Sequence, residues 1–357
     1  MRKHASGLLV AAVTAAAMTG VTGGAAASAV TRVALPTTSM STTAVAPVPS
    51  LAPHHVVARF APGAGGAFAE SMARLDERHL IVSLTQFGTE RADGSWTDNF
   101  GQLFTVAANG RKSVFGPRVN LGACAQFMGV AVDPARRVFV AVGNFDSSCG
   151  PASPASGVYR VRSDGFSRVM TLPAGVFANG LTVHRGQLYV TDSHGGAVYR
   201  GPALRTSSPT TPWFSDVRLT PTTSLSIGAN GIASRDGRLY LTGYARGNVI
   251  AVAIDRHGRP GRVELVAHDP RLVRADGITF DPRGRLWASV NPTVDFTTMT
   301  QTGEGSIVSI DRRGRISTLP VAPGSLDYPT QSIWLRGKLY VANGAFVHGT
   351  PSVVAIG

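Results

Sequence analysis

The chain of 357 residues carries little charge, because Lys, Arg, Asp and Glu make up only 15% of it while apolar residues make up 43%. That balance excludes a long coiled coil and a disordered chain, which both need a more polar composition. Only two cysteines are present, so at most one disulfide can form and a metal site built from cysteine alone is excluded. Lysine is scarce too: 31 of the 34 basic residues are arginine, and the formal net charge is +13.

Long helices cannot be frequent in a chain of this composition. The chain holds 41 glycines and 22 prolines, and both residues interrupt helices. Many short strands joined by turns fit this density of helix breakers better than helices do. The sequence therefore favours an all-β fold.

Outside the N-terminus, no segment is apolar enough to span a membrane. At the N-terminus, Arg2 and Lys3 precede an apolar stretch over residues 7–18, and residues 27–29 (Ala-Ser-Ala) fit a cleavage site. We predict a signal peptide over residues 1–29 and a secreted, extracellular protein. A retained anchor is the alternative, but glycines at 20, 23 and 24 interrupt the apolar run.

The rest of the chain divides into a linker and one repeating domain. Residues 30–53 are rich in Thr, Ser, Ala, Pro and Val and almost free of charge, which is typical of an extended linker. From residue 54 to 357 the sequence repeats itself. Six segments align, at residues 70–75, 128–133, 179–183, 230–234, 276–281 and 330–335.

The repeats predict a six-bladed β-propeller with four-stranded blades. The 260 residues from the first to the last repeat start cover five steps, a mean period of 52 residues, and periods of this order with several strands each indicate propeller blades. The last repeat has room for only three strands. The segment 55–60 can supply the fourth, so we expect an N-terminal strand to close the ring on the last blade and remove an open edge.

The two faces of the predicted ring differ. Short, arginine-rich turns gather on one face, and long, varied loops near residues 86–100, 143–156 and 290–305 lie on the other, where binding sites tend to occur. The arginine-rich face is interpreted as a solvated surface, with a polyanion-binding surface as the alternative. No aromatic residues interleave with these arginines, so we expect no nucleic-acid partner.

Inner strands of a propeller converge on the central channel, so their first residues approach one another at one mouth. These positions are Glu70, Met128, Asn179, Asn230, Asp276 and Thr330 or Gln331. Two carboxylates and two carboxamides form an oxygen donor set that suits calcium, or magnesium and manganese with additional waters. Because the set contains no His or Cys, zinc is disfavoured.

Turn chemistry offers another explanation for three of these residues. Asn-Gly and Asp-Gly are common turn dipeptides, since Asx side chains cap turns and glycine accepts positive φ. Glu70 is followed by Ser71, so that explanation does not extend to it. A carboxylate at the start of an apolar inner strand needs a partner. We expect that partner to be one divalent cation, with calcium as the first choice.

At these residues the sequence resembles the propellers of the senescence marker protein, gluconolactonase and luciferin-regenerating enzyme group. The matching segments are Glu70-Ser71, Asn179-Gly180-Leu181, Asn230-Gly231-Ile232 and Asp276-Gly277-Ile278. The resemblance implies that Glu70, Asn230 and Asp276 bind the metal. It also implies that Asn179 contacts the metal or the substrate.

The sequence departs from that group in places that concern the substrate. Gluconolactonases carry an arginine shortly before the blade-three Asn, where this chain has Phe177 and Ala178. Blade two offers Met128 in place of a polar residue. The resemblance therefore bears on the metal site more than on substrate identity.

Weaker candidates lie in the loops of the mouth face. Asp192-Ser193-His194 has the residue types of a nucleophile triad, but the sequence lacks a G-x-S-x-G elbow. These residues are interpreted as the end of a strand. His194 and His348 are interpreted as exposed loop residues, with a role in proton transfer as the alternative.

Two functions fit the sequence best, and a lyase on the same scaffold stays open as a third. The first is a calcium-dependent hydrolase of lactones or related esters, in which the metal polarises the carbonyl and Asp276 acts as, or orients, the base for water. The second is a non-catalytic extracellular propeller of the NHL type that binds a ligand or protein, with any calcium structural. For both functions we expect a monomer.

A disulfide between Cys124 and Cys149 is the last prediction. An exported protein permits oxidation, and both cysteines fall on the predicted mouth face of blade two. The bond would fix a long loop beside the channel.

Overall fold

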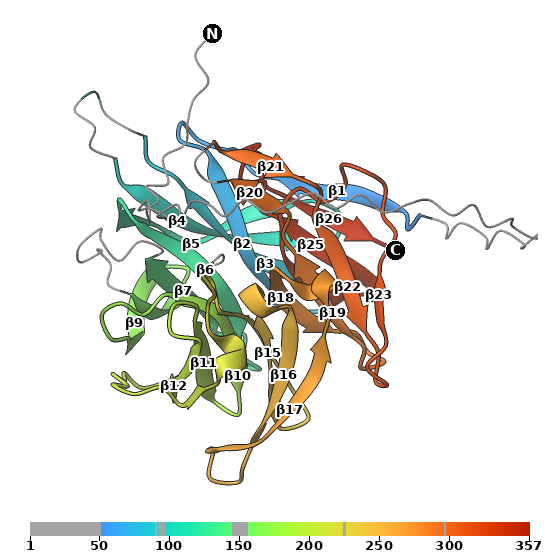
Figure 1. The fold of residues 1–357 in the computed structure, drawn as a ribbon. Helices are drawn as coiled ribbons and strands as arrows, with labels where there is room; N and C mark the ends of the chain where they lie inside the picture. The colour runs from blue at the N-terminus through green and yellow to red at the C-terminus, as the bar shows by residue number, and fades with distance from the viewer. Residues whose placement is uncertain (1–50, 90–91, 93–96, 145–155, 224–225, 296–297) are drawn as a thin grey trace, which may run out of the picture.

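Short apolar strands separated by glycine-containing turns form six four-stranded antiparallel sheets, arranged around a ring (Figure 1). The computed structural model describes residues 51–357 except 90–91, 93–96, 145–155, 224–225 and 296–297. The predicted all-β, six-bladed propeller is confirmed.

Each blade runs from an inner strand at the channel to an outer strand at the rim. Blade one contains β2 (Ala67–Arg74), β3 (His79–Gln86), β4 (Asn99–Ala107) and β5 (Lys112–Gly122). Blade two contains β6 (Ala125–Val132), β7 (Val138–Asn144), β8 (Gly157–Arg162) and β9 (Gly165–Thr171). Blade three contains β10 (Ala178–His184), β11 (Gln187–Asp192), β12 (Ala197–Pro202) and β13 (Phe214–Ser215).

The second half of the ring repeats this order. Blade four contains β14 (Ala229–Arg235), β15 (Arg238–Gly243), β16 (Asn248–Ile254) and β17 (Pro260–His268). Blade five contains β18 (Ala275–Phe280), β19 (Leu286–Val290), β22 (Ser306–Ile310) and β23 (Ile316–Thr318), and the hairpin β20 (Thr293–Asp295) and β21 (Thr300–Thr302) extends one of its loops. Blade six contains β24 (Pro329–Leu335), β25 (Lys338–Asn343) and β26 (Ser352–Ile356).

The N-terminal strand β1 (His54–Arg59) completes blade six. It pairs antiparallel with β26, from His54 opposite Ile356 to Arg59 opposite Ser352. The blue and red ends of the chain therefore lie side by side (Figure 1). This pairing confirms the predicted closure and gives the C-terminal strand a partner on both sides.

The ring is also closed at its centre. Each inner strand contacts the inner strand of the next blade, and β24 of blade six contacts β2 of blade one. Apolar side chains fill the space between neighbouring blades; Phe139, Met170 and Leu188, for example, pack in one cluster from blades two and three. The middle strands are buried on both faces, which explains why the sequence shows continuous apolar runs there.

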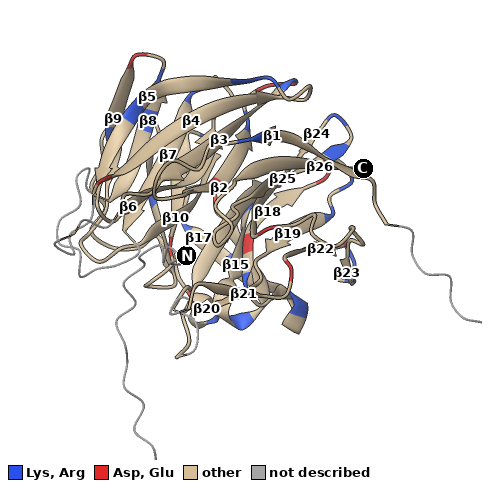
Figure 2. Cartoon of the chain, turned by 90° about the horizontal axis from the view of Figure 1, so that it is seen from above, with Lys and Arg blue, Asp and Glu red and all other residues tan. Residues whose placement is uncertain are grey.

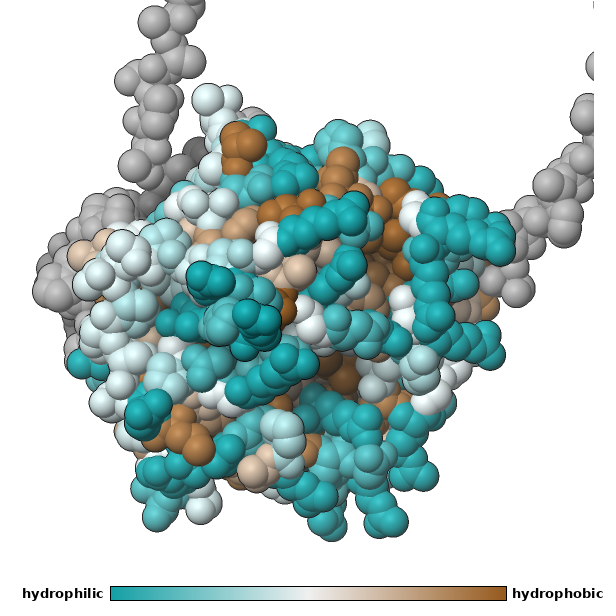
Figure 3. All heavy atoms as spheres, turned by 90° about the horizontal axis from the view of Figure 1, so that it is seen from below, coloured by the Kyte–Doolittle hydropathy of each residue, from teal (hydrophilic) through white to brown (hydrophobic). Residues whose placement is uncertain are grey.

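Charged residues lie mainly in turns and at strand ends (Figure 2). In the view from below, hydrophilic side chains cover most of the surface, and apolar residues show in recesses between them (Figure 3). Three short 3-10 helices occur in the described residues: η2 (Val217–Leu219), η3 (Tyr244–Arg246) and η4 (Pro270–Leu272). No helix in this part of the chain has the length and apolar character that a membrane span requires.

Several predictions fall partly outside the described residues. The signal peptide over 1–29 and most of the linker over 30–53 lie there and stay predictions. At the linker's end, Ala52 donates its backbone N–H to Pro320 O at 2.8 Å. Cys124 lies in the turn between β5 and β6, but Cys149 is outside the described residues, so the Cys124–Cys149 bond also stays a prediction.

Candidate functional site

Every inner strand has a β-bulge near the residue that opens its repeat. The register shifts fall at Ala69/Ser71, Phe127/Val130, Ala178/Leu181, Ala229/Ile232, Ala275/Ile278 and Pro329/Gln331. A bulge inserts an unpaired residue and redirects its side chain. The six bulges occur at matching positions. In each blade, one residue near the channel therefore leaves the regular alternation of side chains along its strand.

The glycine after the bulged residue is required by close packing of neighbouring inner strands. A Cβ on Gly180 would lie 2.3 Å from Asn230 O, and one on Gly231 would lie 2.1 Å from Asp276 O. These pairs lie inside strands β10 and β14, so their glycines do not serve turns. Turn chemistry is therefore the wrong explanation for the Asx-Gly pairs, and steric contact between blades is the correct one.

Hydroxyl groups of the second strands fix the bulges across the blade boundaries. Thr191 Oγ1 donates to Asn230 O at 2.8 Å, and Thr242 Oγ1 donates to Asp276 O at 3.2 Å. Thr242 Oγ1 also accepts from Gly231 N at 2.7 Å. Each of these threonines is fully buried. The backbones that carry Asn230 and Asp276 are thus held by the blade that precedes each of them.

One small cavity at the mouth brings together the four polar residues that the sequence predicts. Its volume is about 60 Å³, and a volume on the order of 10–15 Å³ holds one water. A cation with a few waters therefore fits. The lining residues are Phe68, Glu70, Gln126, Met128, Phe177, Asn179, Ile227, Asn230, Asp276, Asn291, Tyr328 and Phe346.

The two carboxylates in this cavity are buried and close enough to interact. Burial raises the pKa of Asp276 to about 8, although hydrogen bonds from Asn291, the Gly277 backbone N–H and Asn230 act in the opposite direction. Burial and the charge of Asp276 raise the pKa of Glu70 well above its usual value. Among the described residues, no Lys or Arg forms an ion pair with either carboxylate.

This electrostatic environment fits a hard cation. Two buried carboxylates that repel each other are relieved by a bound positive charge. No group of three or more His, Cys, Asp and Glu residues suited to a metal occurs in the described part of the chain. A cation in the cavity would therefore be held by the carboxylates of Glu70 and Asp276 together with amide oxygens, of which Asn230 and Asn179 supply two in the same cavity.

Aromatic side chains form one wall of the cavity. The ring centroid of Phe68 lies 5.3 Å from that of Phe346 and 5.8 Å from that of Tyr328. Tyr328 has a φ of 57°, an uncommon backbone conformation for a bulky residue. Burial and the charges of Asp276 and Glu70 raise the pKa of Tyr328, so its phenol stays neutral at neutral pH.

Blade six differs from the sequence prediction. Neither Thr330 nor Gln331 lines the cavity, because Thr330 Oγ1 donates to Ala69 O at 2.9 Å and Gln331 Nε2 donates to Ile278 O at 3.1 Å. Tyr328, two residues earlier, occupies the mouth instead. The sequence reasoning missed Tyr328 and also Asn291, which bonds Asp276 and directly follows the second strand of blade five. A polar residue ending an apolar strand beside the predicted mouth was the available signal for Asn291.

The triad-like residues do not form a triad. Ser193 Oγ donates to the backbone carbonyl of Ala229 at 2.7 Å, and Asp192 accepts from the backbone N–H groups of Phe177 and His194. The interpretation of these residues as a strand end is therefore correct. His348 Nδ1 lies 3.0 Å from Asp327 Oδ1 and is largely exposed.

Comparison with solved structures shows what this fold is similar to. A gluconolactonase from Xanthomonas campestris aligns with 85% of this chain and 89% of its own, at 18% identity and a TM-score of 0.55. A calcium-binding regucalcin from Agrobacterium tumefaciens aligns with 82% of this chain and 93% of its own, at 17% identity and a TM-score of 0.53. The chain shares the gluconolactonase and regucalcin fold.

A putative gluconolactonase gives the same result, with 11% identity, coverage of 86% of this chain and 92% of its own, and a TM-score of 0.53. No protein-family description and no curated protein sequence matches the chain. At these identities the similarity establishes the gluconolactonase-like propeller fold.

Proposed function

We propose that the protein is an exported, calcium-dependent hydrolase of lactones or related esters. The observation that carries the proposal is the single cavity in which Glu70, Asn179, Asn230 and Asp276 meet, with two buried carboxylates that no described basic residue neutralises. The structural similarity to gluconolactonase and to a calcium-binding regucalcin supports it.

The oxygen donors of the cavity have distinct tasks in this proposal. Glu70, Asn230 and Asp276 hold the cation, which when bound would supply Lewis-acid polarisation of a carbonyl group. Asn179 has a neutral amide in the same cavity and orients the substrate. Asn291 donates a hydrogen bond to Asp276 and so fixes the orientation of its carboxylate.

Asp276 is the proposed base. A bound divalent cation lowers the pKa of a carboxylate beside it, so the Asp276 side chain stays ionised at neutral pH when the site is loaded. An ionised Asp276 can accept a proton from a water at the mouth. The aromatic wall of Phe68, Tyr328 and Phe346 excludes bulk water from one side of that position.

Calcium titration calorimetry and a hydrolysis screen together test the proposal. Wild-type protein should bind calcium and hydrolyse members of a lactone and aryl-ester panel, and chelator should abolish the activity. Glu70→Gln should lose calcium binding, whereas Glu264→Gln, a matched change at an exposed residue paired with Arg238, should not.

The outcomes separate the two functions that fit the sequence. Calcium binding without hydrolysis of any panel member would contradict the hydrolase and favour the non-catalytic propeller. Calcium binding that is unaffected by Glu70→Gln would show that the cation lies elsewhere.

A further inference from the structure

Four turns of the propeller share one hydrogen-bonded structure on the arginine-rich face. In each, an Asp donates its backbone N–H to the carbonyl of an Arg four residues later, and that Arg donates its own N–H to the Asp Oδ1. The pairs are Asp133 and Arg137, Asp255 and Arg259, Asp281 and Arg285, and Asp311 and Arg315. The repeated structure makes the four arginines directly comparable.

The β18–β19 turn of blade five, with Asp281 and Arg285, differs from the other three in its side chains. Arg137, Arg259 and Arg315 each use Nε to bond the Oδ2 of their own aspartate. In the β18–β19 turn, Trp287 Nε1 donates to Asp281 Oδ2 at 3.2 Å and takes that place. The Arg285 guanidinium lies 5.7 Å from the Trp287 ring centroid, and no described carboxylate pairs with it.

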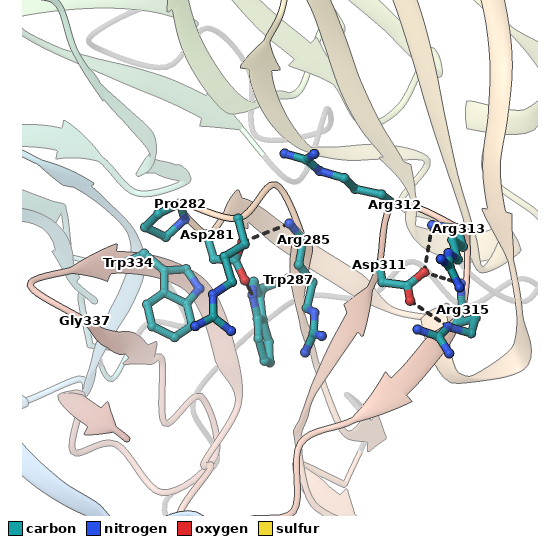
Figure 4. A pocket seen from close by; sticks show the side chains of 11 residues that line it. Asp281, Pro282, Arg285, Trp287, Asp311, Arg312, Arg313, Arg315, Trp334 and Gly337 are labelled. Carbon is teal, nitrogen blue, oxygen red and sulfur yellow. Dashed lines mark hydrogen bonds and ion pairs between the residues drawn. The ribbon is translucent and has the colours of Figure 1, made fainter.

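The unpaired Arg285 lines a pocket formed by the two turns of blade five together with Trp334 and Gly337 of blade six (Figure 4). The pocket has a volume of about 760 Å³, within the range of small-molecule sites. Five arginines and two aspartates line it, which leaves a net charge of +3. These are Arg283, Arg285, Arg312, Arg313, Arg315, Asp281 and Asp311.

The second turn of blade five, between β22 and β23, contributes another unpaired arginine. Arg312 lies against the backbone of the β18–β19 turn, because a Cβ on Gly284 would meet Arg312 Nε at 2.8 Å. No described carboxylate forms an ion pair with Arg312. The close approach that Gly284 permits thus brings cations from two turns of blade five to one pocket.

Two tryptophans supply apolar surface to the same pocket. The rings of Trp287 and Trp334 lie 5.7 Å apart between centroids. Trp334 Nε1 is buried and has no hydrogen-bond partner in the described part of the chain. On the far side, Gly337 leaves open space where a side chain would stand.

We propose that this pocket binds an anionic sugar that carries two or more phosphate or sulfate groups. Guanidinium groups match the geometry of such oxyanions, and the flat faces of tryptophan suit the apolar face of a sugar ring. Arg137, Arg259 and Arg315 are each paired with the aspartate of their own turn. Arg285 and Arg312 are not, so unpaired positive charge gathers in this pocket. A local excess favours a discrete ligand over a long polyanion such as nucleic acid.

Titration calorimetry with defined probes tests this site. Glucose 1,6-bisphosphate and a disulfated heparin disaccharide separate a phosphate from a sulfate ligand, and at least one should bind more tightly than pyrophosphate. Arg285→Gln and Arg312→Gln should each weaken that binding about fivefold. Arg259→Gln, the same charge change in a turn whose arginine is paired, should leave it unchanged.

Trp287→Phe probes the arrangement without changing charge. It removes the Nε1 donor, so Asp281 can pair with Arg285 as in the other turns, and binding should weaken as in Arg285→Gln. Thermal melting checks that the variant folds; if it does not, the arginine variants decide. Failure of both sugars to bind, an equal loss in Arg259→Gln, or tighter binding of a single-stranded oligonucleotide would each overturn the proposal.

Discussion

Without calcium, the buried carboxylates of the mouth should make the protein less stable as pH rises. The pKa of Asp276 in the folded state is about 8, against 3.8 for the ordinary side chain, and burial is the main cause. Between these values the folded state binds more protons than the unfolded state. The free energy of unfolding therefore falls as pH rises through this window and is highest at the acidic end.

The size of the effect follows from the proton count. One proton of difference changes the free energy of unfolding by about 1.4 kcal/mol per pH unit. Asp276 alone should thus cost about 3 kcal/mol between pH 5 and pH 7 in the calcium-free protein. Glu70, whose pKa is also raised, acts in the same direction. Calcium should remove the loss, since it favours the ionised carboxylates and binds the folded state only.

Urea unfolding at several pH values, with chelator and with saturating calcium, measures this dependence. Asp276→Asn should flatten the slope in chelator and reduce the stabilisation by calcium. Asp236→Asn, a matched change at an exposed turn residue, should keep both. A calcium-free wild type whose stability does not fall between pH 5 and pH 7 would refute the reasoning, as would an unchanged slope in the double variant Glu70→Gln with Asp276→Asn.

Three further predictions concern catalysis, the disulfide and the ring. Asp276→Asn should lower kcat about 100- to 10,000-fold at saturating calcium, as expected for a positioned base; near-normal kcat on a hydrolysed substrate would make Asp276 a structural ligand. Reduction of the Cys124–Cys149 bond should lower the free energy of unfolding by about 3 kcal/mol, and mass labelling that finds two free thiols in exported protein would contradict the bond. Gly231→Ala should cost about 1–3 kcal/mol through its clash with the next blade and should weaken calcium binding, whereas Gly165→Ala, where a Cβ meets no atom within 4 Å, should do neither.

The fold could be predicted because each blade repeats the same physical pattern. Apolar strands buried on both faces and a mean period of 52 residues fix the number of blades, and the missing strand of blade six points to the N-terminal segment. The meeting of Glu70, Asn179, Asn230 and Asp276 could be predicted for the same reason, since equivalent positions of a ring converge.

Residues outside the repeat could not be predicted in this way. Tyr328 lies at the mouth, in the segment before β24, and has a φ of 57°. No sequence pattern predicts that backbone conformation for a tyrosine. Thr330 instead occupies the bulge of that strand, where its hydroxyl bonds the backbone of blade one. The repeat period of the sequence predicts where blade six meets the mouth. Which side chain of that segment reaches the cavity depends on the local backbone conformation.

The bulges connect the fold to the chemistry of both faces. A regular strand would alternate its side chains between the two adjoining blade interfaces, and both interfaces are apolar. A bulge frees one residue per blade from that alternation, so Asp276 can enter a shared cavity while Ile278 stays in the core. On the opposite face, Trp287 in β19 removes the partner of Arg285. At the mouth the bulges bring two carboxylates together without a described basic partner, and in the β18–β19 turn Trp287 takes the place of Arg285 at Asp281. These are the two positions where we propose that ligands bind.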